Sequence, residues 1–108
     1  MALSSHPTGG HPKGDNAQLR MHYIYLLSST NKKWIYVGCT DDLKVRFKQH
    51  QNGEVKSTKA HRPFKLIYYE AYISKTDALA REYKIKNHSQ TKELLYKQLE
   101  KSIYGAII

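Results

Sequence analysis

The strongest constraint on the fold is a pair of strand-type segments separated by six polar residues. The segments HYIYLL, residues 22–27, and WIYVG, residues 34–38, are dense in aromatic and β-branched residues, which fit a pleated surface. Between them, SSTNKK is a cluster of turn-forming residues. We therefore expect residues 22–38 to form a β-hairpin.

Helix and strand signals alternate after the hairpin. Thr40 or Asp41 is expected to cap a helix that ends near Gln51. A polar loop closed by Pro63 follows this helix, and FKLIYYEAYI, residues 64–73, predicts a third strand.

Two further helices are predicted in the C-terminal part. Ser74 and Asp77 form an S-x-x-D capping box for a helix that ends near Asn87. Ser89 is expected to cap a last helix through about Lys101. The order β-β-α-β-α-α predicts an α+β domain with a small three-stranded antiparallel sheet flanked by helices.

Length, composition and charge limit the function classes. The 108 residues suit one domain; residues 1–20 are rich in Pro, Gly, Ser and His and predict a disordered leader, which leaves residues 21–108 as the domain. The single cysteine, Cys39, excludes an intramolecular disulfide, and we expect a reduced, cytoplasmic setting without a membrane span. A net charge of +9 favours nucleic acid, then an anionic membrane surface, although simple solubility also explains it.

The first predicted helix carries polar residues where apolar ones are expected. Leu43 and Phe47, four residues apart, define its apolar stripe. Arg46 and His50 follow Leu43 by three and seven positions, so all four residues share one broad face. A guanidinium at the margin of an apolar stripe needs an anion, because an unpaired buried charge is strongly unfavourable.

Two alternatives remain open for each of the charged residues. Arg46 could form a structural ion pair with Glu70 or Glu82, or it could bind an anionic substrate. Glu82 lies among apolar residues of the second predicted helix. It could pair with Lys86 one turn later, or it could act as a metal ligand or a buried acid.

Tyrosine side chains lie on the hairpin beside these charged residues. The chain has nine tyrosines, and Tyr23 and Tyr25 share one face of their strand because side chains alternate. Tyr36 immediately precedes the end of the second strand. A phenol, an arginine, a histidine and a carboxylate could thus converge, a set that suits phosphodiester hydrolysis with a divalent metal.

At this level of detail the chain resembles the GIY-YIG nuclease domain. The resemblance rests on YIY at residues 23–25, YVG at residues 36–38, Arg46 eight residues beyond the glycine, the segment HRPFKLIYYE and the helix that carries Glu82. It covers about residues 21–100, and the single-domain, UvrC-like branch is closest in layout.

The resemblance implies specific roles for five residues. Tyr25 belongs to the first motif, and Tyr36 of the second would be the general base or would position the water. Arg46 would stabilise charge on the scissile phosphate, and Glu82 would hold one Mg²⁺ or Mn²⁺ ion. His50 stands where the family carries a residue that hydrogen-bonds near the nucleophile, so we expect Arg46 and His50 to face an active-site cleft.

Two positions depart from the pattern of the family. Tyr23 replaces the glycine that gives the first motif its name, and this merely continues a strand. Cys39 stands where repair nucleases of this type often carry a lysine. A cation beside the phosphate is therefore missing, which bears on the strength of catalysis rather than on its existence.

Basic side chains suggest how nucleic acid would be held. Those expected to contact it are Lys56, Lys59, His61, Arg62, Lys84 and Lys86, with Lys92 and Lys97 nearby on the last helix. The resemblance favours DNA over RNA. Without a separate recognition domain, cleavage is expected to be structure-selective or nonspecific. The expected role is in DNA repair or processing, near the nucleoid. A protein partner could direct the choice of substrate. The alternatives are a noncatalytic nucleic-acid-binding module on the same fold and a structural protein with an Arg46–Glu82 ion pair.

Overall fold

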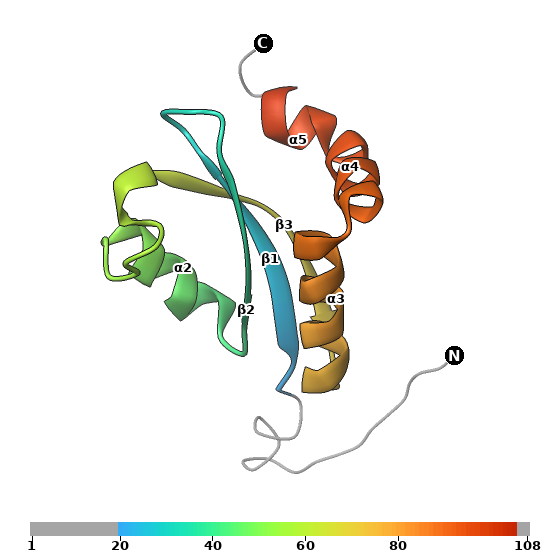
Figure 1. Ribbon diagram of the computed structural model, residues 1–108. Coiled ribbons are helices and arrows are strands. Elements are labelled where there is room, and N and C mark those ends of the chain that lie inside the picture. The colour runs from blue at the N-terminus through green and yellow to red at the C-terminus, as the bar shows by residue number, and fades with distance from the viewer. Residues whose placement is uncertain (1–19, 106–108) are drawn as a thin grey trace.

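The computed structural model describes residues 20–105. Nearly all of the predicted leader, residues 1–19, lies outside the described residues. The described elements follow the order β1, β2, α2, η1, β3, α3, α4, α5 (Figure 1). The predicted α+β class with a three-stranded antiparallel sheet is confirmed. No helix in this part of the chain is long and apolar enough to cross a membrane.

The first strand of the hairpin lies at the centre of the sheet, and the second strand lies at one edge. β1 (His22–Ser29) is the central strand, and β2 (Ile35–Thr40) and β3 (Phe64–Tyr72) flank it. Both neighbours run antiparallel to β1, and the short connection between β1 and β2 confirms the predicted hairpin. β2 is therefore an edge strand whose outer side has no strand neighbour in the described chain.

Helices cover both faces of this sheet (Figure 1). α2 (Leu43–Gln51) lies on one face, and α3 (Lys75–Asn87) lies on the other, where it contacts all three strands. α4 (Ser89–Gln98) packs against α3, and α5 (Glu100–Tyr104) follows it. The 3₁₀ turn η1 (Lys59–His61) precedes β3 in the loop after α2.

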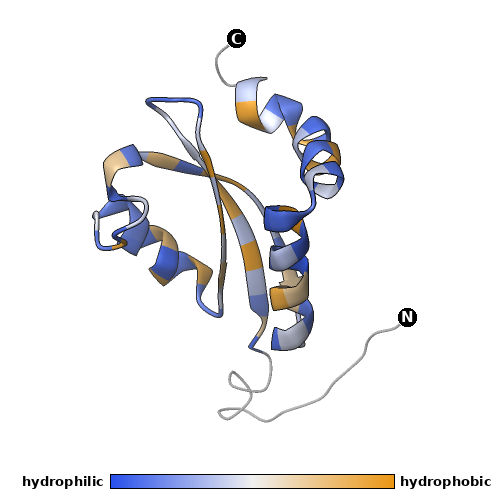
Figure 2. Ribbon diagram, viewed as in Figure 1, coloured by the Kyte–Doolittle hydropathy of each residue, from blue (hydrophilic) through white to orange (hydrophobic). Residues whose placement is uncertain are grey.

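Each face of the sheet has its own apolar cluster. The cluster on the α3 side consists of Ile24, Leu26, Val37, Ala78, Ile85 and Leu95. The cluster on the α2 side consists of Tyr25, Leu27 and Phe64, with Trp34, Tyr36, Leu43 and Phe47 packed against it. Because alternate residues of β1 enter opposite clusters, this strand is apolar on both faces. Figure 2 shows hydrophobic segments along β1, between the helices.

The helix boundaries confirm one predicted cap and correct two others. The Ser74 side chain accepts a hydrogen bond from the backbone N–H of Asp77, as predicted. α2 is capped by Asp42, not by Thr40 or Asp41, because the Asp42 carboxylate accepts from the backbone N–H of Val45.

The last predicted helix is two helices with a different start. Ser89 is the first residue of α4, and its N-cap is His88, whose backbone is extended (φ −116°, ψ 105°). Helix α4 ends at Gln98, and Leu99 joins it to α5. The sequence predicted one helix through Lys101 because neither glycine nor proline marks the break.

A polar cluster joins β3 to α3. Arg81 donates to both carboxylate oxygens of Glu70, from Nε at 2.9 Å and from an amino nitrogen at 3.0 Å. The hydroxyls of Tyr68 and Tyr72 donate to the same carboxylate. Burial by itself would raise the pKa of Glu70, but these hydrogen bonds outweigh it and hold the pKa below its ordinary value. This cluster fixes α3, the helix that carries Glu82, against the sheet.

We predict that Glu70→Gln destabilises the protein at pH 7. The Arg81 side chain is 29% exposed and that of Glu70 17%, so the pair is more buried than a surface ion pair. Removing the charge should lower the free energy of unfolding by about 2 kcal/mol, between an exposed pair and a fully buried one. Urea unfolding measures the change, with the exposed Glu93→Gln as the matched control. Equal effects of the two substitutions would contradict the role of the cluster.

Candidate active site

The site begins where a tyrosine of β1 crosses a glycine of β2. Tyr25 lies directly opposite Gly38 in the antiparallel register. A Cβ atom at position 38 would lie 2.5 Å from the Tyr25 hydroxyl and 2.8 Å from the ring of Tyr36. Only glycine, which has no side chain, fits there. The missing side chain lets the rings of Tyr25 and Tyr36 approach to 6.2 Å between their centroids.

A buried histidine of α2 holds the Tyr25 hydroxyl. His50 Nε2 lies 2.7 Å from this hydroxyl, and His50 Nδ1 lies 2.8 Å from the hydroxyl of Thr58. Thr58 donates its own proton to the carbonyl of Val55, so its oxygen is left to accept from His50 Nδ1–H. His50 Nε2 then accepts from Tyr25 O–H, and the neutral histidine satisfies both partners.

His50 lies deeper than the sequence analysis expects. The expectation was a side chain that faces a cleft, whereas His50 and Thr58 are both 0% exposed. Thr58 was missed, since the loop after α2 showed only a polar composition and nothing placed one of its hydroxyls under the histidine. His50 is therefore a buried support behind Tyr25.

Burial keeps both members of this hydrogen-bonded pair neutral. Burial, aided by the positive charge of Arg46, lowers the pKa of His50 from 6.5 to about 4. Burial also raises the pKa of Tyr25 from 10.0 to about 12, against the opposing effect of Arg46. Near neutral pH, Tyr25 thus holds its proton and His50 does not acquire one.

Arg46 carries a charge that no carboxylate neutralises within residues 20–105. Its guanidinium donates to the side-chain oxygen of Gln49 at 2.9 Å, and its charge acts on both Tyr25 and His50. The two ion pairs considered from the sequence, with Glu70 or Glu82, do not form. This half-buried cation can therefore bind an anion from outside the chain.

Tyr36 lies at the edge strand between the two helical layers. Its ring centroid is 5.1 Å from that of His50, which comes from α2. Lys86 Nζ of α3 lies 5.9 Å from the centroid of the same ring. Side chains from opposite faces of the sheet thus meet around β2.

Glu82 approaches this edge from α3. Its side chain is 18% exposed, and it pairs with Lys86 at 3.1 Å, so the ion pair considered from the sequence does form. Its negative charge adds to burial in raising the pKa values of Tyr25 and Cys39. The carboxylate therefore acts on the motif residues of both β1 and β2.

The ligand set suits a metal that takes most of its ligands from elsewhere. No group of three or more His, Cys, Asp or Glu side chains gathers anywhere in the described residues. Mg²⁺ typically binds one or two protein carboxylates, keeps several waters and completes its coordination with substrate phosphate. The half-buried Glu82 carboxylate fits such an ion, whereas a site made only of protein ligands does not fit.

The predicted nucleic-acid contacts lie on two separate elements. Those on the loop and 3₁₀ turn after α2 are Lys56, Lys59, His61 and Arg62, and those on α3 are Lys84 and Lys86. Five of the six are exposed. His61 differs, because its ring stacks on Trp34 at 3.6 Å and its Nδ1 is buried without a partner in the described chain.

Comparison with known proteins identifies the family. The GIY-YIG catalytic domain matches residues 21–101. The chain belongs to the GIY-YIG family. A UPF0213 protein of Staphylococcus saprophyticus is 40% identical over 74 residues, which span 68% of this chain and 89% of that protein. A UPF0213 protein of Staphylococcus epidermidis is 38% identical over the same shares. The solution NMR structure of the UPF0213 protein from Bacillus halodurans has 32% identity and a TM-score of 0.44, and covers 69% of this chain and 82% of that one.

GIY-YIG family membership agrees with the two tyrosine motifs and with the glycine between their rings. YIY and YVG occupy the facing strands β1 and β2, and Gly38 lies where Tyr25 crosses. The steric reason for this glycine is the phenol of the opposite strand, which fills the space of its side chain.

We predict that the buried neutral His50 makes the protein sensitive to mild acid. Its pKa is about 4 in the folded state and near 6.5 when unfolded, so between these values only the unfolded state binds the proton. Stability should be complete above pH 6.5 and fall as the pH drops toward 4, by about 3 kcal/mol in total. Urea unfolding at several pH values measures the loss.

The matched variants separate His50 from other acid effects. His50→Gln should lower the stability at pH 7, but it should also flatten the fall in stability between pH 6.5 and 4.5, because glutamine binds no proton in either state. The same substitution at the exposed His88 should leave the pH dependence of the parent. A parent protein equally stable at pH 7 and pH 5 would contradict the burial argument.

Proposed function

We propose that this protein is a metal-dependent endonuclease that hydrolyses phosphodiester bonds in DNA. The observation that carries the proposal is the Arg46 guanidinium, which has no carboxylate partner in the described chain and lies beside Tyr25, the tyrosine of the first motif of a GIY-YIG domain. A half-buried cation in this position suits the negative charge of a scissile phosphate.

The proposed roles follow from the surroundings of each side chain. Arg46 stabilises the charge that develops on the phosphoryl oxygens. Tyr36, which is half-buried at the sheet edge, orients the attacking water or accepts its proton. Tyr25 stays protonated, donates a hydrogen bond to His50 and packs beside the ring of Tyr36.

Glu82 is the proposed ligand of one Mg²⁺ or Mn²⁺ ion. Such an ion would supply positive charge to the phosphoryl group as a Lewis acid. In the protein itself, Lys86 pairs with the carboxylate at 3.1 Å and lies over the Tyr36 ring at the edge of β2.

Lys86 also offers the cation that position 39 lacks. Burial, aided by the charge of Glu82, raises the pKa of the Cys39 thiol, and the positive charges of Lys75 and Lys86 oppose this rise. The Lys86 ammonium lies 5.9 Å from the Tyr36 ring. We propose that Lys86, released from Glu82 when a metal binds, contacts the phosphate in place of the lysine that related nucleases carry after the second motif.

A noncatalytic nucleic-acid-binding module is the second candidate. The observation that favours it is the Glu82–Lys86 ion pair, because a paired carboxylate is less available to a metal. Structure-selective or nonspecific action on DNA in repair or processing suits the enzyme, and phosphate contacts by exposed lysines suit both candidates.

We predict that Glu82→Gln abolishes metal-dependent nicking of supercoiled plasmid. The amide has the same shape but no charge for the metal, so the rate should fall by roughly 100-fold or more. DNA binding in chelator should not weaken, because phosphate contacts come from other residues and the loss of the carboxylate leaves Lys86 free to add to them. Glu93→Gln, on the exposed side of α4, is the control. A Glu82→Gln protein that nicks at the parental rate would exclude this residue as the ligand, and a parent that binds but never nicks would favour the noncatalytic module.

We further predict that cleavage rises with pH from about 6 to 9.5 and that Tyr36→Phe removes the rise, because a general base must lose its own proton before it can accept one from water. His50 cannot produce it, because with a pKa of about 4 it is already deprotonated throughout this range. Tyr25 cannot produce it either, because its pKa is about 12. Single-turnover nicking measures both profiles, with the exposed Tyr83→Phe as the control. An unchanged profile in Tyr36→Phe would exclude its hydroxyl as the titrating group.

A further inference from the structure

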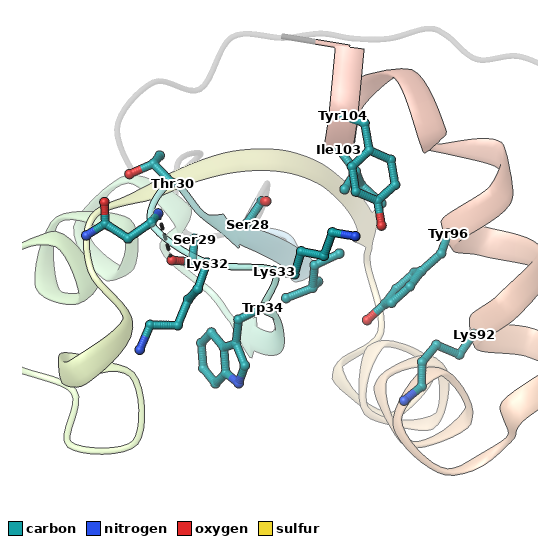
Figure 3. Close-up of a pocket in the computed structure, with 12 residues that line it drawn as sticks. Ser28, Ser29, Thr30, Lys32, Lys33, Trp34, Lys92, Tyr96, Ile103 and Tyr104 are labelled. Atoms are coloured by element: carbon teal, nitrogen blue, oxygen red, sulfur yellow. Dashed lines mark hydrogen bonds between the residues drawn. The ribbon is translucent and has the colours of Figure 1, made fainter. Parts of the chain in front are cut away.

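A groove lies between the hairpin turn and the C-terminal helices, apart from the candidate active site. It has a volume of about 540 Å³ and is lined by the turn between β1 and β2 and by side chains of α4 and α5 (Figure 3). None of the five proposed catalytic residues lines it. Figure 3 shows Lys33 on the turn side and Tyr96 and Tyr104 on the helix side, directed toward the space between them.

The groove combines cations with aromatic rings and has no acidic side chain in its lining. Lys33 and Lys92 approach it from opposite walls, and neither forms an ion pair with another described residue. Lys33 Nζ lies 6.0 Å from the centroid of the Tyr104 ring, which is 46% exposed. Burial raises the pKa of Tyr96, so this ring is an uncharged surface. The lining therefore suits a flat, π-rich group attached to an anion.

A hydroxyl at the groove adds a polar contact. Ser28 is only 6% exposed and lines the groove. The hydroxyl of its neighbour Ser29 donates to the carbonyl of His61. A serine hydroxyl at the groove can donate to or accept from the edge of a base.

From these observations we propose that the groove binds one unpaired nucleotide of a single-stranded nucleic acid. The base stacks on Tyr104 and Tyr96, its adjacent phosphates contact Lys33 and Lys92, and Ser28 contacts the base edge. A base in a duplex is stacked on both faces and paired at one edge, so it cannot enter a groove of this size without leaving the helix. Aromatic stacking with a basic surface is how single strands are bound without sequence preference.

The groove lies on a path that starts at the candidate active site. Trp34 lines the groove and stacks beside Tyr36, with 6.2 Å between the ring centroids. Along β2, the step from Gly38 to Trp34 is about 13 Å. Lys86 lies near the Tyr36 ring and Lys92 lines the groove, so a cation lies at each end of this path. This placement rests on the proposed nuclease function, because it puts an unpaired base a short distance from the bond that is cut.

Binding without metal tests the groove separately from catalysis. The full-length chain is titrated in chelator against a fluorescently labelled ~12-nucleotide oligothymidylate and against a duplex of the same length, with anisotropy as the readout. Tyr104→Ala should weaken single-strand binding by about 5-fold or more, and Tyr104→Phe should retain it, because stacking needs the ring. Lys33→Ala, in an exposed turn, should reduce the salt dependence of log affinity by about 0.7.

The controls carry the same side chains elsewhere on the surface. Tyr83→Ala on α3 and Lys101→Ala on α5 alter exposed residues that do not line the groove, and both should bind the single strand as the parent does. Duplex affinity should stay within about 2-fold for every variant, since the duplex relies on phosphate contacts elsewhere.

Three results would overturn the proposal. These are parental single-strand affinity in both Tyr104→Ala and Lys33→Ala, an equal loss for single strand and duplex, and displacement of the oligonucleotide by thymidine monophosphate, which would make the groove a site for a free nucleotide. The outcome is independent of cleavage. A parent that nicks plasmid while the groove variants bind normally would refute the groove alone. A parent that never nicks while the variants lose single-strand binding would refute the nuclease alone.

Discussion

The arrangement of the site depends on one close approach, the Tyr25 phenol against the backbone of Gly38. The position of this phenol is fixed from two sides, by the missing side chain of Gly38 and by the hydrogen bond to His50. Because His50 is held in turn by Thr58, a strand, a helix and a loop share one buried polar chain. Such a chain stays in place only when every member is satisfied, which the neutral histidine achieves.

The edge position of β2 explains how two helical layers serve one site. A side chain on the central strand is enclosed on both faces, whereas one on an edge strand can be reached by groups that pass around the edge. Tyr36 accordingly lies near His50 of α2 and Lys86 of α3. The position of α3 on the sheet is fixed elsewhere, by the Glu70–Arg81 pair that joins β3 to α3. The far edge of the sheet thus positions the carboxylate that acts at the near edge.

Local signals in the sequence were sufficient for most of the fold. The hairpin, β3 and the Ser74 cap follow from strand-type composition, turn residues and a capping pattern that extend over a few neighbouring residues. The division between α4 and α5 at Leu99 was missed, because it follows from packing and no helix-breaking residue marks it. The His88 cap was missed because a serine, the stronger capping type, stands next to it.

The site was predictable to the extent that it depends on spacing. Helical periodicity placed Arg46 and His50 on one face, but it could not tell a buried histidine from an exposed one. That difference depends on Thr58, which is distant from the motifs and has no signature of its own. The partners in the ion pairs could not be predicted from the sequence either. Glu70 was an equally plausible partner for Arg46 on charge alone, and only the three-dimensional packing assigns it to Arg81.

The distribution of carboxylates determines where positive charge is left unpaired around β2. Glu70 is neutralised by Arg81 on the far strand, and Glu82 by Lys86, whereas Arg46 has no acidic partner in the described chain. A metal at Glu82 would release Lys86 beside Tyr36, on the α3 side of the edge strand, while Arg46 lies on the α2 side beside Tyr25. Positive charge would then be concentrated where a phosphate must lie, and only when the metal is present. This coupling would make strong phosphate binding at the catalytic edge depend on metal, while the groove beside Tyr104 would hold its base without one.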